Sequence, residues 1–486
     1  MITKFFKLEE HGTNVKTELI AGITTFMTMA YILAINPAIL SVTGMESGAL
    51  FTATALAAII GTVCMALFAN YPFALAPGMG LNAFFAFSVV LGMGISWEMA
   101  LAAVFVEGII FLLMSLFNLR EAIFKAIPTS LKHAVGAGIG IFIAFIGFQN
   151  ANITILDSST KVTVFEITKY NALFPGEAYS FSNVGITVAL ALAGVLLTAI
   201  MLAKNVKGAI LWGMLITYFI GLICEFTGIY VPYYPVDANN IAFYSLIPDF
   251  SNGLSIPSIK PLLFKLDFSM LLTAEFFAVV LAFLFVDLFD TLGTIIGVSS
   301  KANMLDEDGN LPRIKGALMA DAVATTAGAL IGTSTTTTYV ESAAGVSAGG
   351  RTGLTALVTA ILFTLSLFLS PIFLAMPSFA TAPALIIVGF LMIGSVKEIN
   401  FEEISEGLPA FLTISAMAFT YSISEGIVFG VISYVVINVA TRRFDKLNCL
   451  LVVIAILFSI KYVASDYFAY LALPIIVVAY IIAKLK

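Results

Sequence analysis

The sequence predicts an all-α membrane protein with about fourteen transmembrane helices, arranged as two inverted halves of seven spans. Composition is the first reason. Of the 486 residues, 60% are hydrophobic and only 11% are charged, whereas a soluble domain carries about 25% charged residues. The second reason is patterning, because the apolar residues come in blocks of about 15 to 25, the length that crosses a hydrocarbon core as a helix. The third is a pair of interrupted spans, described below.

The apolar blocks and the polar, proline or glycine breaks between them define the expected spans. A tail at 448–484 holds two further apolar runs, and the sequence leaves open whether they cross the membrane. Long polar loops are expected at 151–182 and 229–268. The expected spans are 18–40, 48–69, 79–94, 97–118, 133–150, 183–203, 208–228, 269–295, 314–332, 338–349, 353–372, 382–396, 408–421 and 424–440.

The distribution of basic residues predicts the orientation. Lys and Arg concentrate in cytoplasmic loops. With a cytoplasmic N-terminus, 16 of the 23 Lys and Arg residues fall on the inside, and only 4 fall in outside loops before residue 441. We therefore expect a multi-pass protein of the cell membrane, embedded in its lipid bilayer, with the N-terminus in the cytoplasm.

Two spans are not simple helices. The segment "ANYPFALAPGMGLNAFFAFS" (69–88) carries Pro72, Pro77 and Gly78 just before a short apolar run. The segment "GALIGTSTTTTYVESAAGVSAGG" (328–350) contains four consecutive threonines, which favour extended backbone. Such backbone is tolerated at membrane depth only where it is buried in protein or lines a cavity. We expect short extended segments before half-helices three and ten, which is typical of a transporter site.

The two interruptions also indicate the repeat. An offset of 259 residues pairs Asn82 with Glu341 and Thr28 with Asp287. Residue identity between the halves is otherwise poor, so the repeat rests on hydropathy and on the positions of the breaks. An odd number of spans in each half forces the halves into opposite orientations.

The half-helices would begin inside the membrane, with their partial positive N-termini facing each other. Asn82 and Glu341 lie at or near those starts, and spans one and eight would add hydroxyls and two aspartates. Ionisable residues within a span are functional by default. The pocket residues expected from these positions are Thr24, Thr25, Thr28, Asn82, Asp287, Asp290, Thr338 and Glu341.

Simpler explanations hold for other residues. Glu107, Glu275 and Glu425 also lie at or within spans, and we expect structural roles for them. The threonine run could be a packing surface, although its position beside Glu341 favours the pocket. Phe84, Phe85 and Phe87 could stack on a ligand or belong to the core.

The expected pocket suits a neutral, planar substrate. Three close carboxylates in a low dielectric cannot all be ionised cheaply, so a proton or another cation must enter. A carboxylate can accept two parallel N–H bonds from a purine edge, and Phe84 could stack on the ring. A proton on a carboxylate that also contacts the substrate couples the two thermodynamically. We therefore expect Asp287, Asp290 and Glu341 to serve proton coupling as well as substrate binding.

Several motifs together carry a resemblance to a known family. They are "TTFMTMAYILAINPAIL", "ANYPFALAPGMGLNAFFAFSVVLGMGISW", "AVGAGIGIFIAFIGFQ", "DLFDTLGT", "TSTTTTYVESAAGV" and "FTYSISEGIVFG". In order and over nearly the whole chain, these resemble the azaguanine-like (AzgA-type) purine permeases, a branch of the nucleobase–ascorbate transporter superfamily. The resemblance implies the fold of the bacterial uracil permeases and proton-coupled uptake of guanine and hypoxanthine, with adenine as a further substrate.

The resemblance also implies domains and site residues. A core domain would comprise 18–118 and 269–372, and a gate domain 133–228 and 382–440. Asn82, Asp287 or Asp290, and Glu341 would contact the substrate, with Asp321 as a supporting carboxylate. Related xanthine permeases favour Asp290 in span eight, whereas the azaguanine-like pattern singles out Asp287.

Other functions remain open at this point. The same fold could carry xanthine, uracil or an inorganic anion, or the acidic cluster could serve a cation channel or exchanger. An enzyme is not expected, because no nucleophile–base pair or metal set appears. We expect no cofactor, no metal site and no nucleic-acid partner. The oligomeric state, with a homodimer as one option, is not determined by the sequence.

Overall fold

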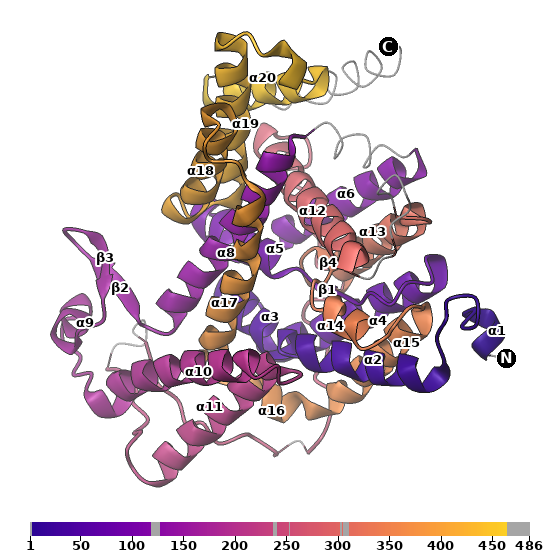
Figure 1. The fold of residues 1–486 in the computed structure, drawn as a ribbon. Coiled ribbons are helices and arrows are strands. Elements are labelled where there is room, and N and C mark those ends of the chain that lie inside the picture. The colour runs from indigo at the N-terminus through magenta and orange to yellow at the C-terminus, as the bar shows by residue number, and fades with distance from the viewer. Residues whose placement is uncertain are drawn as a thin grey trace.

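The chain folds into helices that surround a small crossing of two extended segments, labelled β1 and β4 in Figure 1. The computed structural model describes residues 2–117, 127–236, 241–251, 253–301, 304 and 311–463. Everything stated about the structure concerns these residues.

The predicted all-α membrane fold class is confirmed. Eleven described helices are long and apolar enough to cross a membrane. Two shorter apolar helices, Met79–Gly92 and Ile404–Phe419, and the half-helix α14 (Ser342–Ser347) occupy the positions of the other three predicted spans. All fourteen segments follow one another in the predicted order along the described chain.

The first seven crossings and their loops come from the N-terminal half. Its elements are α1 (Ile2–Phe5), α2 (Val15–Met29), α3 (Ile32–Leu40), α4 (Ser47–Phe68), β1 (Leu75–Pro77), α5 (Met79–Ala83) with the π-helix η2 (Phe84–Gly92), α6 (Trp97–Leu116), α8 (Thr129–Asn150), β2 (Thr154–Asp157), β3 (Lys161–Val164), α9 (Ile167–Leu173), η3 (Phe181–Gly185), α10 (Ile186–Ala203) and α11 (Ala209–Phe226).

The C-terminal half supplies the other seven. Its elements are α12 (Ala274–Lys301), α13 (Ile314–Ile331), β4 (Thr336–Thr338), α14, α15 (Gly353–Ser366), α16 (Ser370–Leu374), α17 (Ser378–Met392), the 3₁₀-helix η5 (Ile393–Glu398), α18 (Ile404–Phe419), α19 (Ile423–Ala440), η6 (Phe444–Lys446) and α20 (Cys449–Val463). Helix α20 packs on α19, and the ring of Phe458 lies 5.6 Å from that of Phe285 on α12. Residues 464–484 of the predicted tail lie outside the described residues.

Span one differs from the single helix expected at 18–40. It begins earlier, at Val15, where the Asn14 side chain accepts a 3.0 Å hydrogen bond from the Thr17 N–H and caps the helix. It is also interrupted at Ala30 and Tyr31, between α2 and α3. Just before the break, the Thr28 hydroxyl bonds to the backbone oxygen of Thr25 at 2.8 Å, a contact that competes with the helical ladder.

The long helices pack mainly within two groups (Figure 1). In one group, α13 packs on α4 and α6, and α15 packs on α2 and α4. In the other, α8 packs on α17 and α18, while α10 packs on α11 and α17. The functional division into a core and a gate domain stays a prediction, as does the cytoplasmic N-terminus.

The two extended segments pair with each other in antiparallel register. Leu75 faces Thr338 and Pro77 faces Thr336, so the pairing is symmetric about its middle residues. The pairing continues on both sides, because Gly78 N–H donates to Thr335 O and Tyr339 N–H donates to Ala74 O, each at 3.0 Å. Antiparallel pairing of equivalent segments is what an inverted repeat requires. It also satisfies backbone groups that no water reaches.

Glu18 fastens span one to the start of α15. Its buried carboxylate accepts hydrogen bonds from the N–H groups of Arg351, Thr352 and Thr355, and from both threonine hydroxyls. A carboxylate is favourable there because the first N–H groups of a helix lack partners within it. The Arg351 guanidinium in turn donates to the backbone oxygens of Val346 and Gly350, at the end of α14.

Helix α14 also packs closely on α2, and Gly345 makes this packing possible. A Cβ at Gly345 would press on the Thr25 hydroxyl and would lie 2.8 Å from the backbone oxygen of Ala21. The Thr25 hydroxyl could rotate away, but the Ala21 oxygen belongs to the backbone of α2 and could move only with that helix. The close contact between α14 and α2 therefore requires a glycine at position 345.

We predict that Gly345→Ala destabilises the protein by about 1–3 kcal/mol, the usual cost of overpacking a tight contact. The measurement is the melting temperature of the purified protein in detergent. Gly394→Ala is the matched control, because a Cβ there meets no described heavy atom within 4 Å. Equal melting temperatures for the two variants would contradict this account of the α2–α14 contact.

Candidate functional site

The predicted site residues gather around the crossing of β1 and β4. Half-helices α5 and α14 begin there, and α2 and α12 pack alongside α14. Asp290 bonds to Thr337 of β4, Glu341 follows β4 by three residues, and Asp321 shares the Thr291 hydroxyl with Asp287, three residues before Asp290. The acidic side chains of spans eight, nine and ten therefore do converge, and each has partners that are described in turn below.

Glu341 lies at the start of α14 and is partly exposed. Its Oε1 accepts a hydrogen bond from the hydroxyl of Tyr31, which is fully buried at the interruption of span one. The Thr28 hydroxyl makes a longer contact, 3.4 Å, to the backbone oxygen of Glu341. Span one thus contacts the glutamate at its side chain and at its backbone.

The other two predicted threonines of span one point elsewhere. The Thr24 hydroxyl donates to Ile20 O at 2.8 Å, within its own helix. Thr25 is buried against Gly345, and its hydroxyl has no hydrogen-bond partner among the described residues. Thr25 is therefore part of the packing between spans one and ten, whereas the Thr24 hydroxyl is satisfied within span one.

Asp290 is the more accessible of the two span-eight aspartates. It is partly exposed, and its Oδ2 accepts a 3.2 Å hydrogen bond from the Thr337 hydroxyl of β4. The neighbouring Thr338 is buried, and its hydroxyl has no partner among the described residues. A carboxylate and an unsatisfied hydroxyl thus lie beside the same extended segment.

Asp287 lies one turn earlier on α12 and is fully buried. Its Oδ1 is 2.8 Å from the Thr291 hydroxyl, which is also 2.8 Å from Oδ1 of Asp321 on α13. All three side chains are inaccessible to solvent. One hydroxyl therefore bridges two carboxyl groups of neighbouring spans.

Asn82 is fully buried in α5, at the position that the repeat pairs with Glu341. Its Oδ1 accepts from the Ser334 hydroxyl, and its Nδ2 donates to Pro77 O at 3.3 Å. The Tyr339 hydroxyl donates to the same oxygen at 2.5 Å. Asn82 therefore ties together the loops that precede both half-helices.

Two expectations about neighbouring side chains can now be compared with the structure. Phe84 is buried, with its ring edge-to-face against Phe283 at 5.0 Å, so in this conformation it belongs to the packed core. Glu107 makes a contact of the kind expected for a structural role, because its Oε2 accepts a 2.8 Å hydrogen bond from the Thr335 hydroxyl. Glu107 thereby holds the turn before β4.

Sequence reasoning missed the partners of the acidic residues. Tyr31, Thr291 and Ser334 each bond directly to a predicted site residue. Their signal in the sequence is weak, since Tyr31 is a single polar residue in an apolar span, and Thr291 and Ser334 stand beside polar residues from which nothing distinguishes them. Among the described residues, no group of three or more His, Cys, Asp or Glu is arranged to hold a metal ion.

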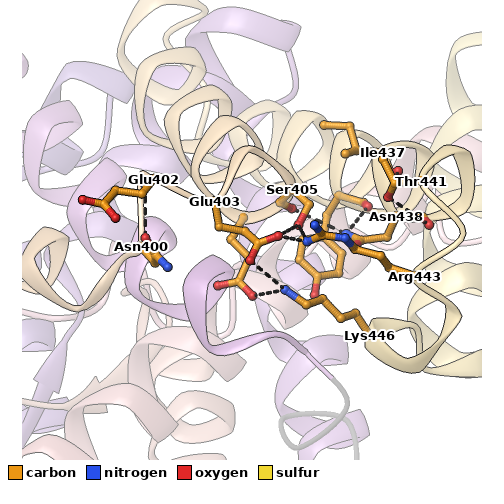
Figure 2. Close-up of polar contacts among 11 residues, drawn as sticks. Asn400, Glu402, Glu403, Ser405, Ile437, Asn438, Thr441, Arg443 and Lys446 are labelled. Carbon is orange, nitrogen blue, oxygen red and sulfur yellow. Dashed lines mark hydrogen bonds and ion pairs between the residues drawn. The ribbon is translucent and has the colours of Figure 1, made fainter.

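A second polar cluster lies away from this site, at the ends of α18 and α19 (Figure 2). Glu403 pairs with Arg443, and the Lys446 Nζ lies 2.8 Å from Oε1 of Glu406 and 3.7 Å from Oε2 of Glu403. Ser405 bonds to both Glu403 and Arg443. An open cavity of about 590 Å³ adjoins it. Since these charges pair with one another, the cluster braces the junction before α20.

Comparisons with known proteins give a consistent result. A model of the xanthine/uracil permeases, described as "Permease family", matches residues 16–429. The guanine/hypoxanthine permease PbuO of Bacillus subtilis is 44% identical over 460 residues, covering 94% of this chain and 99% of that protein. The adenine permease AdeP of Escherichia coli is 39% identical over 466 residues, covering 96% and 97%.

Solved structures of the same architecture are more distant in sequence. The transmembrane domain of the cyanobacterial bicarbonate transporter BicA matches with a TM-score of 0.59 and 17% identity, over 86% of this chain and 97% of that one. The murine anion transporter Slc26a9 in its inward-facing state matches with a TM-score of 0.57 and 11% identity, over 87% and 68%. At these identities the likeness shows the fold alone.

We predict that Thr291→Val lowers the stability of the protein by about 2–3 kcal/mol, because two buried carboxyl oxygens lose the hydroxyl between them. The measurement is thermal unfolding in detergent. Thr217→Val is the matched control: Thr217 is equally buried, but its hydroxyl bonds only to a backbone oxygen of its own helix, Gly213 O at 2.7 Å. If both variants lose the same stability, the bridge contributes nothing beyond an ordinary buried hydroxyl.

Proposed function

Because the chain belongs to the xanthine/uracil permease family, we propose that it imports purine nucleobases together with protons, with guanine and hypoxanthine as its main substrates. Family membership makes the chain a multi-pass membrane transporter of nucleobases, not an enzyme. The choice among purines, the proton coupling and the site residues are the parts that we propose.

The observation that carries the substrate proposal is the pair of acidic residues beside the crossing, Asp290 and Glu341, neither of which is fully buried as a residue. Carboxylates accept hydrogen bonds, so they suit a ligand whose edge presents N–H groups. Purines have such an edge and carry no charge to be neutralised. The unsatisfied Thr338 hydroxyl adds a donor for a ring nitrogen or a carbonyl oxygen. The guanine/hypoxanthine names of PbuO and PbuG support this choice of cargo.

Within span eight, we assign the substrate contact to Asp290 and proton retention to Asp287. Asp290 is accessible beside β4, whereas Asp287 is sealed behind it. The Thr291 hydroxyl has one hydrogen and can donate it to only one of its two carboxyl neighbours. The second 2.8 Å contact is a hydrogen bond only if a carboxyl group supplies the proton. The Asp287–Thr291–Asp321 bridge therefore favours one bound proton.

The proposed transport cycle follows from how the two predicted domains meet. The core segments, 18–118 and 269–372, carry all the proposed site residues, and the gate segments, 133–228 and 382–440, face them. At the interface, Ser88 of η2 donates to the backbone oxygen of Tyr421 at 2.9 Å, and the rings of Phe87 and Tyr421 meet edge-to-face at 5.8 Å. Movement of the core against the gate would break these contacts and expose the site alternately to the two sides.

We expect the reconstituted protein to take up labelled hypoxanthine saturably, and faster when the outside of the liposome is acidic. Unlabelled guanine should compete best, adenine less well and uracil least, and a protonophore should remove the acceleration. Stronger competition by xanthine or uracil would contradict guanine and hypoxanthine as the main substrates. Uptake that does not depend on the pH gradient would contradict proton coupling. An ohmic current without saturable uptake would indicate a channel.

Substitutions separate the proposed roles of the three carboxylates. Glu341→Ala should reduce uptake at least about 100-fold, since it removes a hydrogen-bonded charge from the pocket. Asp290→Asn should raise KM for hypoxanthine about tenfold. Asp287→Asn should flatten the dependence on pH with a smaller effect on KM. Glu166→Gln, in an exposed ion pair with Lys169, is the control and should resemble wild type. Exchanged phenotypes for Asp287 and Asp290 would reverse the assignment.

A further inference from the structure

Tyr31 is a buried residue whose hydroxyl bonds to a side chain of the proposed site. It lies where span one is interrupted, between α2 and α3, and none of its surface is exposed. Its hydroxyl donates to Oε1 of Glu341, a residue 310 positions later in the chain. This one hydrogen bond therefore joins the break between α2 and α3, in the first half of the chain, to the start of α14, in the second half.

The bond differs from those made by other buried tyrosines of the chain. The hydroxyls of Tyr218, Tyr230 and Tyr339 donate to backbone oxygens, namely those of Leu246, Tyr244 and Pro77. Such bonds satisfy the hydroxyl of a buried tyrosine and need no functional explanation. The Tyr31 hydroxyl instead holds a carboxylate that is itself partly exposed.

The contact limits the freedom of Glu341. A glutamate side chain loses conformational entropy when it is ordered. Here part of that ordering exists before any ligand binds, because Oε1 is bonded to the Tyr31 hydroxyl. A binding group ordered in advance loses less freedom on binding, and the affinity rises accordingly.

We propose that Tyr31 is a positioning residue for substrate binding: its hydroxyl fixes the Glu341 carboxylate through Oε1 and leaves Oε2 for an N–H group of the purine. This inference rests on the proposed function and deepens it. It also gives the interruption of span one a purpose, since the break places the tyrosine ring against the start of α14. Thr28, one turn earlier, contacts the backbone of the same glutamate and supports the arrangement.

The test is Tyr31→Phe in the full chain, reconstituted in liposomes, with labelled hypoxanthine as the probe. We expect KM to rise about tenfold, equivalent to about 1.4 kcal/mol of binding. We expect Vmax to stay within about threefold of wild type, because α14 and Glu341 are still present. Hypoxanthine should also raise the melting temperature of the purified variant less than it raises that of wild type.

Tyr218→Phe is the matched control. Tyr218 is also buried and loses one hydroxyl bond, to Leu246 O at 2.7 Å, but it lies on α11, away from the site. A KM for Tyr31→Phe equal to that of Tyr218→Phe would overturn the inference. So would a Tyr31→Phe variant that fails to accumulate as folded protein while Tyr218→Phe does, because the hydroxyl would then be needed for folding. The wild-type arm tests the proposed function separately: absence of any purine uptake there refutes that function, whatever the variants do.

Discussion

The pairing of β1 with β4 is the interaction on which the centre of the molecule depends. Backbone N–H and C=O groups at membrane depth have no water to bond to, so an interrupted span must find partners within the protein. Here the backbone groups of the two interrupted segments bond to each other, from Leu75 opposite Thr338 to Pro77 opposite Thr336. An interrupted span in one half alone would leave its backbone groups without hydrogen-bond partners. The half-helices, and the polar side chains at their starts, exist because the two halves supply each other's missing bonds.

Hydroxyl groups surround the acidic residues at this crossing. Glu341 receives a bond from Tyr31, Asp290 from Thr337, and Asp287 and Asp321 share Thr291. A hydroxyl can donate to an ionised carboxylate or accept from a protonated one, so it serves both charge states. A lysine or arginine partner would favour only the ionised state. The choice of partner therefore suits the proposed proton coupling, in which these carboxyl groups would gain and lose protons during a cycle.

Much of this arrangement could be predicted from the sequence, and the reason is that its signals are local. Pro77, Gly78 and the threonine run predict the two interruptions. The acidic residues are recognisable because their sequence neighbours are apolar. The partners could not be predicted. Tyr31 and Thr291 are single polar residues whose roles depend on distant segments, 310 and 30 residues away. The interruption of span one falls at Ala30 and Tyr31, neither of which is a helix-breaking proline or glycine, so the sequence carries no local signal for it.

The two halves correspond in the order of their spans but not in local structure or chemistry, since span one is interrupted at Ala30 and Tyr31 whereas α12 of span eight is continuous. The predicted offset pairs Asn82 with Glu341, yet Asn82 lies within α5 and is sealed between Ser334 and Pro77, while Glu341 precedes α14 and is partly exposed. Both span-eight aspartates also belong to the second half, where the first half offers Thr28 as the counterpart of Asp287. The aspartates of spans eight and nine and Glu341 all come from the second half, although the buried Glu107 of the first half also bonds to the turn before β4. In the proposed cycle a small number of acidic groups limits the number of protons to be carried, since each added carboxyl in this low dielectric would need a proton of its own.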